Sequence, residues 1–389
     1  MDSAAVADAP AVTAADVPWG AVWGQDDAVA TLRAAASDPD SMTHAWLITG
    51  PPGSGRSTLA YAFAAALIAE PGDEQAMRQV LAGTHPDMTA LRTEGVIISI
   101  KDARSLVERS YFSPSLGRYR VIVMEDADRM VERTSNVLLK ALEEPPPRTV
   151  WILCAPSEAD LIPTIRSRVR SVRLRVPAVD EVAALISRRD NVDLPTATRA
   201  AREAQSHIGM AHRLATNVEA RTRRDETLKI ALSIRSVSDA VRAAGKLLEL
   251  AGDDAKAITL EKDAEERASA MRSLGVEPGG TIPPALRAQL KNLDEDQKRR
   301  ATRSLRDGLD RIMVDLLSLY RDILLMQLGA SVELINLSIH SDLLSASERS
   351  SAAQTLATMD AIATARRRIE SNVSPALALE AMLISAAGT

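Results

Sequence analysis

Short apolar runs of strand length alternate with segments of helical spacing in the first half of the chain. The runs are AWLIT at residues 45–49, RVIVM at 120–124, VWILC at 150–154 and VRLRV at 172–176. Segments between them, such as residues 135–142, place apolar residues at the three- and four-residue steps of a helix. This alternation predicts an α/β fold with a parallel sheet and helices on both faces.

The pattern becomes helical after Pro177. Residues 179–188 and 194–205 predict two short helices of a small helical lid that ends near Asn217. From about Ala220 onward the spacing is helical throughout, apart from the loop composition of GVEPGGTIPP at residues 275–284. The second half of the chain is therefore expected to be all-α.

One long amphipathic stripe marks this helical half. Its apolar positions are Leu305, Leu309, Ile312, Leu316, Tyr320 and Leu324. The spacing favours a core face and leaves a partner-binding face open, and both can occur in a helical assembly domain.

The length of 389 residues and the change of pattern predict several domains. We expect a flexible tail over residues 1–17, an α/β domain over 18–176, a helical lid over 177–217 and a C-terminal helical domain over 218–389. The tail contains no lysine or arginine, so it lacks the basic start of a signal peptide.

Composition describes a globular chain rich in helix formers, with 46% hydrophobic, 25% charged and 3% aromatic residues. The net charge of -5 gives no strong field for nucleic acid over the whole molecule but allows a local basic face. The single cysteine, Cys154, cannot form an internal disulfide or a thiolate zinc site, which fits a cytoplasmic protein. The longest apolar run, residues 59–69, is shorter than the ~20 residues that cross a bilayer and predicts a buried helix.

The strand at residues 45–49 leads directly into GPPGSGRST, which differs by one residue from a phosphate-binding loop. Such a loop holds phosphates with backbone N–H groups and the start of the next helix, while its lysine reaches the terminal phosphates and its hydroxyl meets Mg²⁺. Here Arg56 takes the lysine position, and its planar fork is a poor substitute for a compact ammonium group. A glycine-rich turn without a ligand is the alternative. The predicted nucleotide-binding residues of the loop are Gly50, Gly53, Gly55, Arg56, Ser57 and Thr58.

Two acids follow the strand at residues 120–124, in the sequence RVIVMEDAD. Nucleotide-hydrolysing enzymes of this type usually carry Asp and then Glu, whereas this chain has Glu125 and then Asp126. Both are predicted site residues, but the reversed order puts the catalytic base in doubt.

Five segments together resemble the clamp-loader branch of the AAA+ ATPases, and most of all its bacterial DNA polymerase III delta-prime subunits. They are VWGQDDAVATL at residues 22–32, HAWLITGPPGSGRST at 44–58, AGTHPD at 82–87, SNVLLKALEEPPP at 135–147 and LIPTIRSR at 161–168. The resemblance covers about residues 20–217 with motifs, and more loosely LYRDILLMQLG at 319–329 and SNVSPALALEAML at 371–383. It implies an AAA+ nucleotide-binding module, a helical lid and a C-terminal oligomerisation domain, or collar.

The resemblance also implies an arc-shaped hetero-pentamer with tau or gamma and delta subunits, acting on the sliding clamp and primer-template DNA. In this family an arginine of a Ser-Arg-Cys motif is offered in trans to the nucleotide of a neighbouring subunit. The matching residues are Ser167, Arg168 and Val169, so the arginine is kept and the cysteine is lost. Arg168, with Ser167 beside it, would act in a neighbour's active site.

Four positions depart from the hydrolytic pattern of the family. Besides Arg56 and the inverted acids, Ala155 follows Cys154 where relatives place a threonine that senses the γ-phosphate. Aligning the lid motif on Gly209 puts His212, next to Arg213, where relatives have an arginine. ATP or ADP with Mg²⁺ remains a candidate cofactor, while efficient intrinsic hydrolysis is not expected.

Relatives carry a four-cysteine zinc module before the AGTHPD segment, but residues 70–87 contain no cysteine. No metal site is therefore carried over, and His85 is interpreted as a structural or surface residue. The leading hypothesis is a non-motor clamp-loader subunit, classed with DNA-directed DNA polymerase only as part of the holoenzyme. The alternatives are an autonomous ATPase of the gamma/tau type and a DNA-binding scaffold with a vestigial loop.

Overall fold

The computed structural model describes residues 19–20, 22–38, 41–93, 96–273, 284–371 and 373–387. The chain forms two compact units, one of Met1–Thr93 with Ile97–His212 and one of Glu94–Val96 with Arg213–Thr389. The predicted tail at 1–17 and residues 275–283 of the predicted loop lie outside the described residues.

The first unit is a five-stranded parallel sheet in the order β2-β3-β4-β1-β5, with helices on both faces. Its elements are α1 (Asp26–Ser37), β1 (Ala45–Thr49), α2 (Arg56–Ile68), α3 (Glu74–Leu81), β2 (Met88–Leu91), α4 (Ile100–Ser110), β3 (Arg120–Met124), η2 (Ala127–Arg129), α5 (Glu132–Glu143), β4 (Thr149–Ala155), η3 (Glu158–Asp160), α6 (Pro163–Arg166) and β5 (Arg170–Arg173). The predicted α/β class is confirmed.

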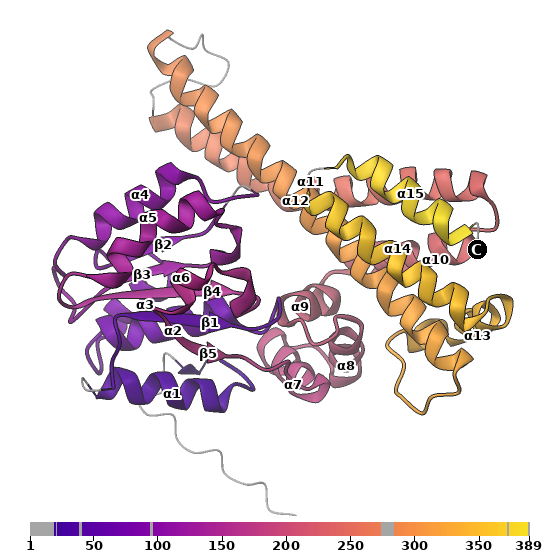
Figure 1. The fold of residues 1–389 in the computed structure, drawn as a ribbon, viewed down its shortest axis with the longest axis horizontal. Helices are drawn as coiled ribbons and strands as arrows, with labels where there is room; N and C mark the ends of the chain where they lie inside the picture. The colour runs from indigo at the N-terminus through magenta and orange to yellow at the C-terminus, as the bar shows by residue number, and fades with distance from the viewer. Residues whose placement is uncertain are drawn as a thin grey trace, which may run out of the picture. The chain divides into compact units, whose positions relative to one another are not determined.

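Helices cover both faces of the sheet (Figure 1), and side chains that alternate along the strands form a core on each face. On β1, Trp46 and Ile48 pack with α1, α2 and α3, whereas Ala45 and Leu47 pack with α4, α5 and α6. All five residues of β1 are buried, as expected for a central parallel strand covered on both faces. The sheet is thus a fixed platform for the loops at its carboxyl edge.

Two strands differ from the prediction. β2 has only four residues, MTAL, which is too short a run to stand out in the sequence. β5 ends at Arg173 and does not extend to residue 176. Beyond the end of β5, the Gln25 side chain pairs with the backbone of Arg175. Its NH₂ group donates to the Arg175 carbonyl at 2.9 Å, and its oxygen accepts from the Arg175 N–H at 3.0 Å. A side chain therefore replaces the neighbouring strand there.

Three short helices follow the sheet: α7 (Val179–Asp190), α8 (Leu194–Glu203) and α9 (Ile208–Thr216). Asp193 caps α8 by accepting from the Thr196 N–H at 2.9 Å. The first two correspond to the predicted lid helices, and α9 adds a third.

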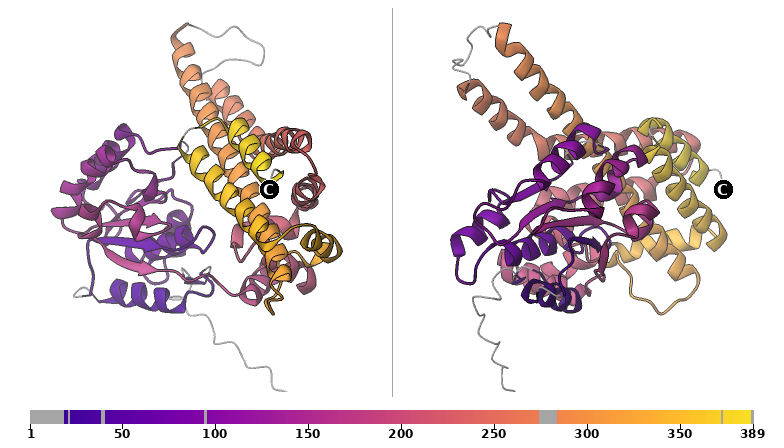
Figure 2. Two further views of the ribbon diagram at one scale, coloured as in Figure 1. Left: turned by 45° about the vertical axis from the view of Figure 1, so that its right-hand side comes forward. Right: turned by 60° about the vertical axis from the view of Figure 1, so that its left-hand side comes forward.

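The second unit is all-α over its described residues. It contains α10 (Val218–Ser233), α11 (Val237–Ser273), α12 (Pro284–Gln327), η4 (Leu337–Ile339), α13 (His340–Arg349), α14 (Ala352–Glu370) and α15 (Pro375–Ala387). The long helices α11 and α12 lie side by side (Figures 1 and 2). On α12 the predicted stripe is a core face, because Leu309, Ile312 and Leu316 are buried among α11, α14 and α15.

Two buried aspartates form hydrogen bonds and ion pairs within this unit. Asp322 on α12 is fully buried and accepts from the backbone N–H groups of Ile335 and Asn336, which fixes the segment before η4. Asp254 on α11 pairs with both Arg213 and Arg223. Burial alone would raise the pKa of Asp254, but Arg213, with Arg311 and Arg223, holds it below its usual value. Both carboxylates are therefore structural.

Candidate nucleotide-binding site

The glycine-rich loop joins the end of β1 to the start of α2. Gly53 and Gly55 have φ angles of 78° and 94°, in the left-handed region that favours glycine. Arg56 is the first residue of the 13-residue helix α2, so the free backbone N–H groups at the helix start face the loop. This geometry suits an anion.

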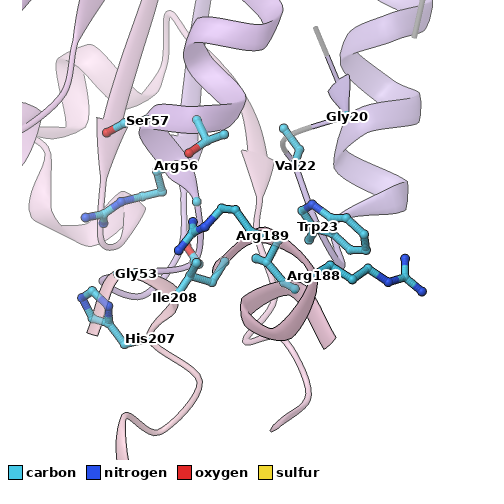
Figure 3. Close-up of a pocket in the computed structure, with 15 residues that line it drawn as sticks. Gly20, Val22, Trp23, Gly53, Arg56, Ser57, Arg188, Arg189, His207 and Ile208 are labelled. Carbon is cyan, nitrogen blue, oxygen red and sulfur yellow. The ribbon is translucent and has the colours of Figure 1, made fainter. Parts of the chain in front are cut away.

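The start of the lid helix α9 contacts Gly53. The Ile208 N–H donates to the Gly53 carbonyl at 3.2 Å. A Cβ atom on Gly53 would lie 2.2 Å from Cγ of His207, closer than side chains can approach. Figure 3 shows the His207 ring beside this glycine. The loop therefore needs glycine here both for its own turn and for contact with the lid.

Arg56 turns back toward the beginning of its own loop. One guanidinium nitrogen, Nη1, donates to the Gly50 carbonyl at 2.7 Å. The side chain is half-buried and still lines the cavity described below. The positive charge of Arg56 thus stays near the loop, and one of its guanidinium nitrogens is already hydrogen-bonded within the chain.

Glu125 connects the loop helix to the end of β3. Its Oε2 accepts from the Ser57 hydroxyl at 2.9 Å, and its Oε1 accepts from the Tyr61 hydroxyl at 2.9 Å. Burial and the charge of Glu125 raise the pKa of Tyr61 well above its usual value, so the phenol stays protonated and donates. Both oxygens of the carboxylate are therefore engaged by α2.

Asp126 and the end of β4 complete this edge of the sheet. Asp126 Oδ1 lies 3.9 Å from Nε of Arg129. Ala155 pairs with Thr49 in the sheet, so the position expected to sense phosphate has no side-chain hydroxyl. Burial raises the pKa of the neighbouring Cys154 thiol to about 12, which keeps it neutral.

A cavity of about 900 Å³ lies over the loop, between it and the lid helices. This volume is in the range of small-molecule sites. Among the predicted residues, the structure brings Gly53, Gly55, Arg56, Ser57 and Thr58 to its wall. The other predicted residues are not among the described residues that line it: Gly50, Glu125 and Asp126.

The lining residues that the sequence prediction did not include are more numerous, and four of them carry rings or charge: Trp23, Arg188, Arg189 and His207. Figure 3 shows Arg56 and His207 at one end of the view, Trp23 and Arg188 at the other, and Arg189 between them. The Arg188 guanidinium carbon lies 5.6 Å from the centre of the Trp23 ring, a cation–π contact. Arg189 donates to the Asp190 carboxylate through Nε and Nη2.

His212 and Arg213, the candidates for the family's lid arginine, do not line the cavity in the part of the chain described. His212 Nδ1 lies 2.7 Å from Oδ2 of Asp190, and the arginine is held by Asp254. Arg188 and Arg189 lie on α7, two helices earlier, and they do line the cavity.

Arg168 follows α6 and lies apart from the residues that line the cavity. Its Nε donates to Glu143 Oε1 at 2.8 Å, and its Nη1 donates to the Thr164 carbonyl at 2.6 Å and to Ser167 Oγ at 3.0 Å. The side chain keeps 32% of its surface exposed. The side chain is thus oriented by neighbouring residues of this chain and stays partly exposed to solvent.

His85 is buried, and its Nδ1 accepts from the Asp87 N–H at 3.1 Å, a structural role. Within the described ranges, no group of three or more His, Cys, Asp or Glu side chains could hold a metal ion. Nor does any helix there combine the length and apolar character needed to cross a membrane.

The parallel sheet, the glycine-rich loop after its β1 strand and the helical lid together have the arrangement of an AAA+ module. Residues 24–178 match the protein family described as DNA polymerase III, delta subunit. The delta-prime subunit of DNA polymerase III from Pseudomonas aeruginosa is 37% identical over 134 residues, which cover 32% of this chain and 41% of that protein. The resemblance to delta-prime subunits is therefore confirmed.

The gamma/tau subunit from Mycobacterium tuberculosis is 30% identical over 179 residues, which cover 43% of this chain and 30% of that protein. The matched regions thus span less than half the length of these relatives. A solved DNA polymerase III gamma subunit-related protein from Thermotoga maritima aligns over 92% of this chain and 99% of its own length, with 18% identity and a TM-score of 0.42. The sequence matches show that part of this chain is similar to DNA polymerase III delta-prime and gamma/tau subunits.

Proposed function

We propose that this chain is a delta-prime-like clamp-loader subunit. It would complete an AAA+ hetero-pentamer with tau or gamma and delta subunits that loads the sliding clamp on primed DNA. The observation that carries the proposal is the match of residues 24–178 to the delta subunit family, a range that includes Ser167 and Arg168.

The catalytic contribution of this subunit is Arg168, offered to the nucleotide of a neighbour. Its position outside its own cavity, its partial exposure and its bond to Glu143 support this role. A guanidinium group supplied in trans neutralises the charge that develops on a transferring phosphoryl group. Glu143 and the Thr164 carbonyl hold the group in one orientation before it meets that charge.

The chain's own cavity fits a nucleotide. Backbone N–H groups after Gly53 and Gly55 and the start of α2 would hold phosphates, with the lid arginines above them. Hydrolysis there is expected to be slow, because Ala155 offers no hydroxyl and Glu125 is held by Ser57 and Tyr61.

The test is Arg168→Ala in a loader reconstituted with delta, tau or gamma, the clamp and primed DNA. We expect single-turnover hydrolysis at the neighbouring site to fall at least tenfold, since an arginine finger contributes roughly 10³–10⁵ in kcat in other phosphoryl-transfer systems. Arg168→Lys should lose most of this effect too, because lysine lacks the planar fork.

The matched control is Arg166→Ala, an exposed arginine two residues earlier on α6. It should leave hydrolysis and clamp loading unchanged. Normal clamp-stimulated hydrolysis with Arg168→Ala, in a loader of normal assembly, would show that the trans role is wrong.

A gamma/tau-type motor is the second candidate, favoured by the 30% identity to the Mycobacterium tuberculosis subunit. The two functions differ in one measurement. A motor alone would turn over ATP at a rate comparable with the assembled loader, whereas a delta-prime-like chain alone would not.

A further inference from the structure

The cavity over the glycine-rich loop carries positive charge without a carboxylate aimed into it. Arg56, Arg188 and Arg189 line it, and none of the described residues in its wall is acidic. Outside the wall, Asp190 accepts from Nε and Nη2 of Arg189, and Asp128 interacts electrostatically with Arg56. The electrostatic character of the wall therefore suits a multiply charged anion.

The residues expected to hold Mg²⁺ are arranged differently from what that ion requires. Mg²⁺ is bound through one or two carboxylates together with substrate phosphates, in strict octahedral geometry. Here the Ser57 hydroxyl donates to Glu125, and Tyr61 occupies the second oxygen of the same carboxylate. A metal ion on phosphates in this cavity would find neither Glu125 nor Asp126 in the wall. The two carboxylates therefore do not fit the metal, and of the residues predicted to meet Mg²⁺ it is Ser57 that lines the wall.

Tyr61 is the feature that distinguishes this arrangement from a simple loop-to-acid hydrogen bond. It lies on α2, one turn after Ser57, so both hydroxyl groups reach the same carboxylate from one helix. The charge of Glu125 is thereby balanced by two neutral donors.

The opposite end of the cavity is apolar. Val22 and Trp23 line it, and the Arg188 guanidinium carbon lies 5.6 Å from the centre of the Trp23 ring (Figure 3). A flat aromatic base fits such a surface, while the phosphates would lie toward Arg56 and the start of α2. The ligand class is therefore a nucleoside polyphosphate, in preference to pyrophosphate alone.

We propose that this cavity binds a nucleoside diphosphate or triphosphate without a divalent cation. The arginines supply the positive charge that Mg²⁺ supplies elsewhere, and Tyr61 holds Glu125 away from metal. The inference rests on the proposed function in taking this cavity as the nucleotide site of an AAA+ subunit.

The experiment is titration of the full chain with fluorescent N-methylanthraniloyl ADP, once with Mg²⁺ and once with EDTA. We expect the two Kd values to agree within twofold. Arg189→Ala should weaken binding about tenfold in both buffers, and Arg173→Ala, an exposed arginine outside the cavity, should not. A Kd at least tenfold weaker in EDTA, or no saturable binding at millimolar ADP, would overturn the proposal.

Tyr61→Phe tests the role of the phenol. It frees one oxygen of Glu125, so Mg²⁺ should now tighten ADP binding about fivefold or more. Tyr111→Phe, an exposed tyrosine outside the cavity, is the matched control and should stay insensitive to Mg²⁺. A Tyr61→Phe chain that still ignores Mg²⁺ would show that Tyr61 does not exclude the metal.

Competition with pyrophosphate shows whether the cavity recognises a nucleoside polyphosphate or only its phosphates. ADP should displace the probe at concentrations at least tenfold lower than pyrophosphate, and equal potency would contradict the nucleoside assignment. Failure of these titrations would leave the Arg168 test untouched, because that role is read from a neighbour's hydrolysis. A loader that needs Arg168 while its subunit binds no nucleotide would refute only the present inference.

Discussion

Asp87 is a fully buried carboxylate whose partners are mostly main-chain groups. It accepts from the N–H groups of Ser115, Leu116 and Gly117 at 2.6–2.7 Å and from the Ser115 hydroxyl at 2.8 Å. Arg120 lies 3.6 Å away. Burial by itself would raise the pKa of Asp87, but these hydrogen bonds outweigh it and lower the pKa to about 2. The aspartate of the AGTHPD motif thus fixes the loop between α4 and β3.

Replacing this carboxylate with an amide, in Asp87→Asn, should lower the free energy of unfolding by about 3 kcal/mol. The new NH₂ group would face backbone donors, and hydrogen bonds to a charged acceptor are worth about 1.5–3 kcal/mol each. Urea unfolding at pH 7 measures the change. Asp180→Asn, an exposed residue in the first turn of α7, should change it by less than about 1 kcal/mol.

The same carboxylate predicts a pH dependence. Because the folded pKa is lowered from its ordinary value of 3.8 to about 2, its stabilisation is complete above pH 4 and is lost as the pH falls toward 2. Thermal unfolding between pH 5 and pH 3 should therefore show a smaller loss of stability for Asp87→Asn than for the natural chain. Parallel curves for the two chains would contradict this account.

At the scale of elements, the contact between the glycine-rich loop and α9 gives a sharp prediction. Gly53→Ala and Gly55→Ala each force a non-glycine residue into a left-handed conformation, at a cost of roughly 1–2 kcal/mol. Only the first also drives a Cβ atom into the His207 ring. Gly53→Ala should therefore be the more destabilising by about 1–3 kcal/mol, the usual cost of overpacking. Thermal unfolding of both variants measures the difference.

Gly55→Ala is the matched control because a Cβ there meets nothing within 4 Å. Shortening the opposing side chain gives the second arm of the test. His207→Ala should recover most of the extra loss in the Gly53→Ala chain, since it removes the ring that the methyl group would strike. Equal losses at the two glycines would show that the lid does not depend on this contact.

How far the elements could be predicted depends on what sets their ends. The apolar runs at 45–49 and 120–124 coincide with β1 and β3, because both strands are covered on both faces. β2 escaped prediction because an edge strand of four residues carries little apolar signal. The end of β5 is decided by the Gln25 side chain, 150 residues away in sequence, which no local pattern reveals.

The site residues could likewise be predicted only where their signal is local in the sequence. Gly53, Gly55, Arg56 and Ser57 could be found because a phosphate loop is a local pattern, and they do line the cavity. Arg188 and Arg189 could not, because their use depends on how α7 lies over the loop. Tyr61 was missed for another reason: it reads as part of a buried helix, and only the structure shows its bond to Glu125.

At the scale of the whole molecule, the departures from a hydrolytic site come from different elements. Arg56 begins α2, Glu125 and Asp126 follow β3, Ala155 ends β4, and His212 lies on α9 bound to Asp190. They also differ in their physical effect. Arg56 changes the cation of the loop, and Glu125 with Asp126 reverses the order of the acids. Ala155 offers no hydroxyl, and His212 is bound to Asp190 and does not face the cavity. Restoring any single position leaves the others unchanged.

The last prediction follows from this distribution. Arg56→Lys restores the loop lysine, yet the isolated chain should still release phosphate from Mg²⁺–ATP no faster than the natural chain. Ser57 and Tyr61 still hold Glu125, and Ala155 still offers no hydroxyl to the γ-phosphate. Phosphate release at saturating ATP measures this, with a gamma or tau subunit as the active reference. If the lysine alone brought turnover to the level of that reference, the other three departures would be irrelevant to catalysis and the subunit would be a motor silenced by one residue.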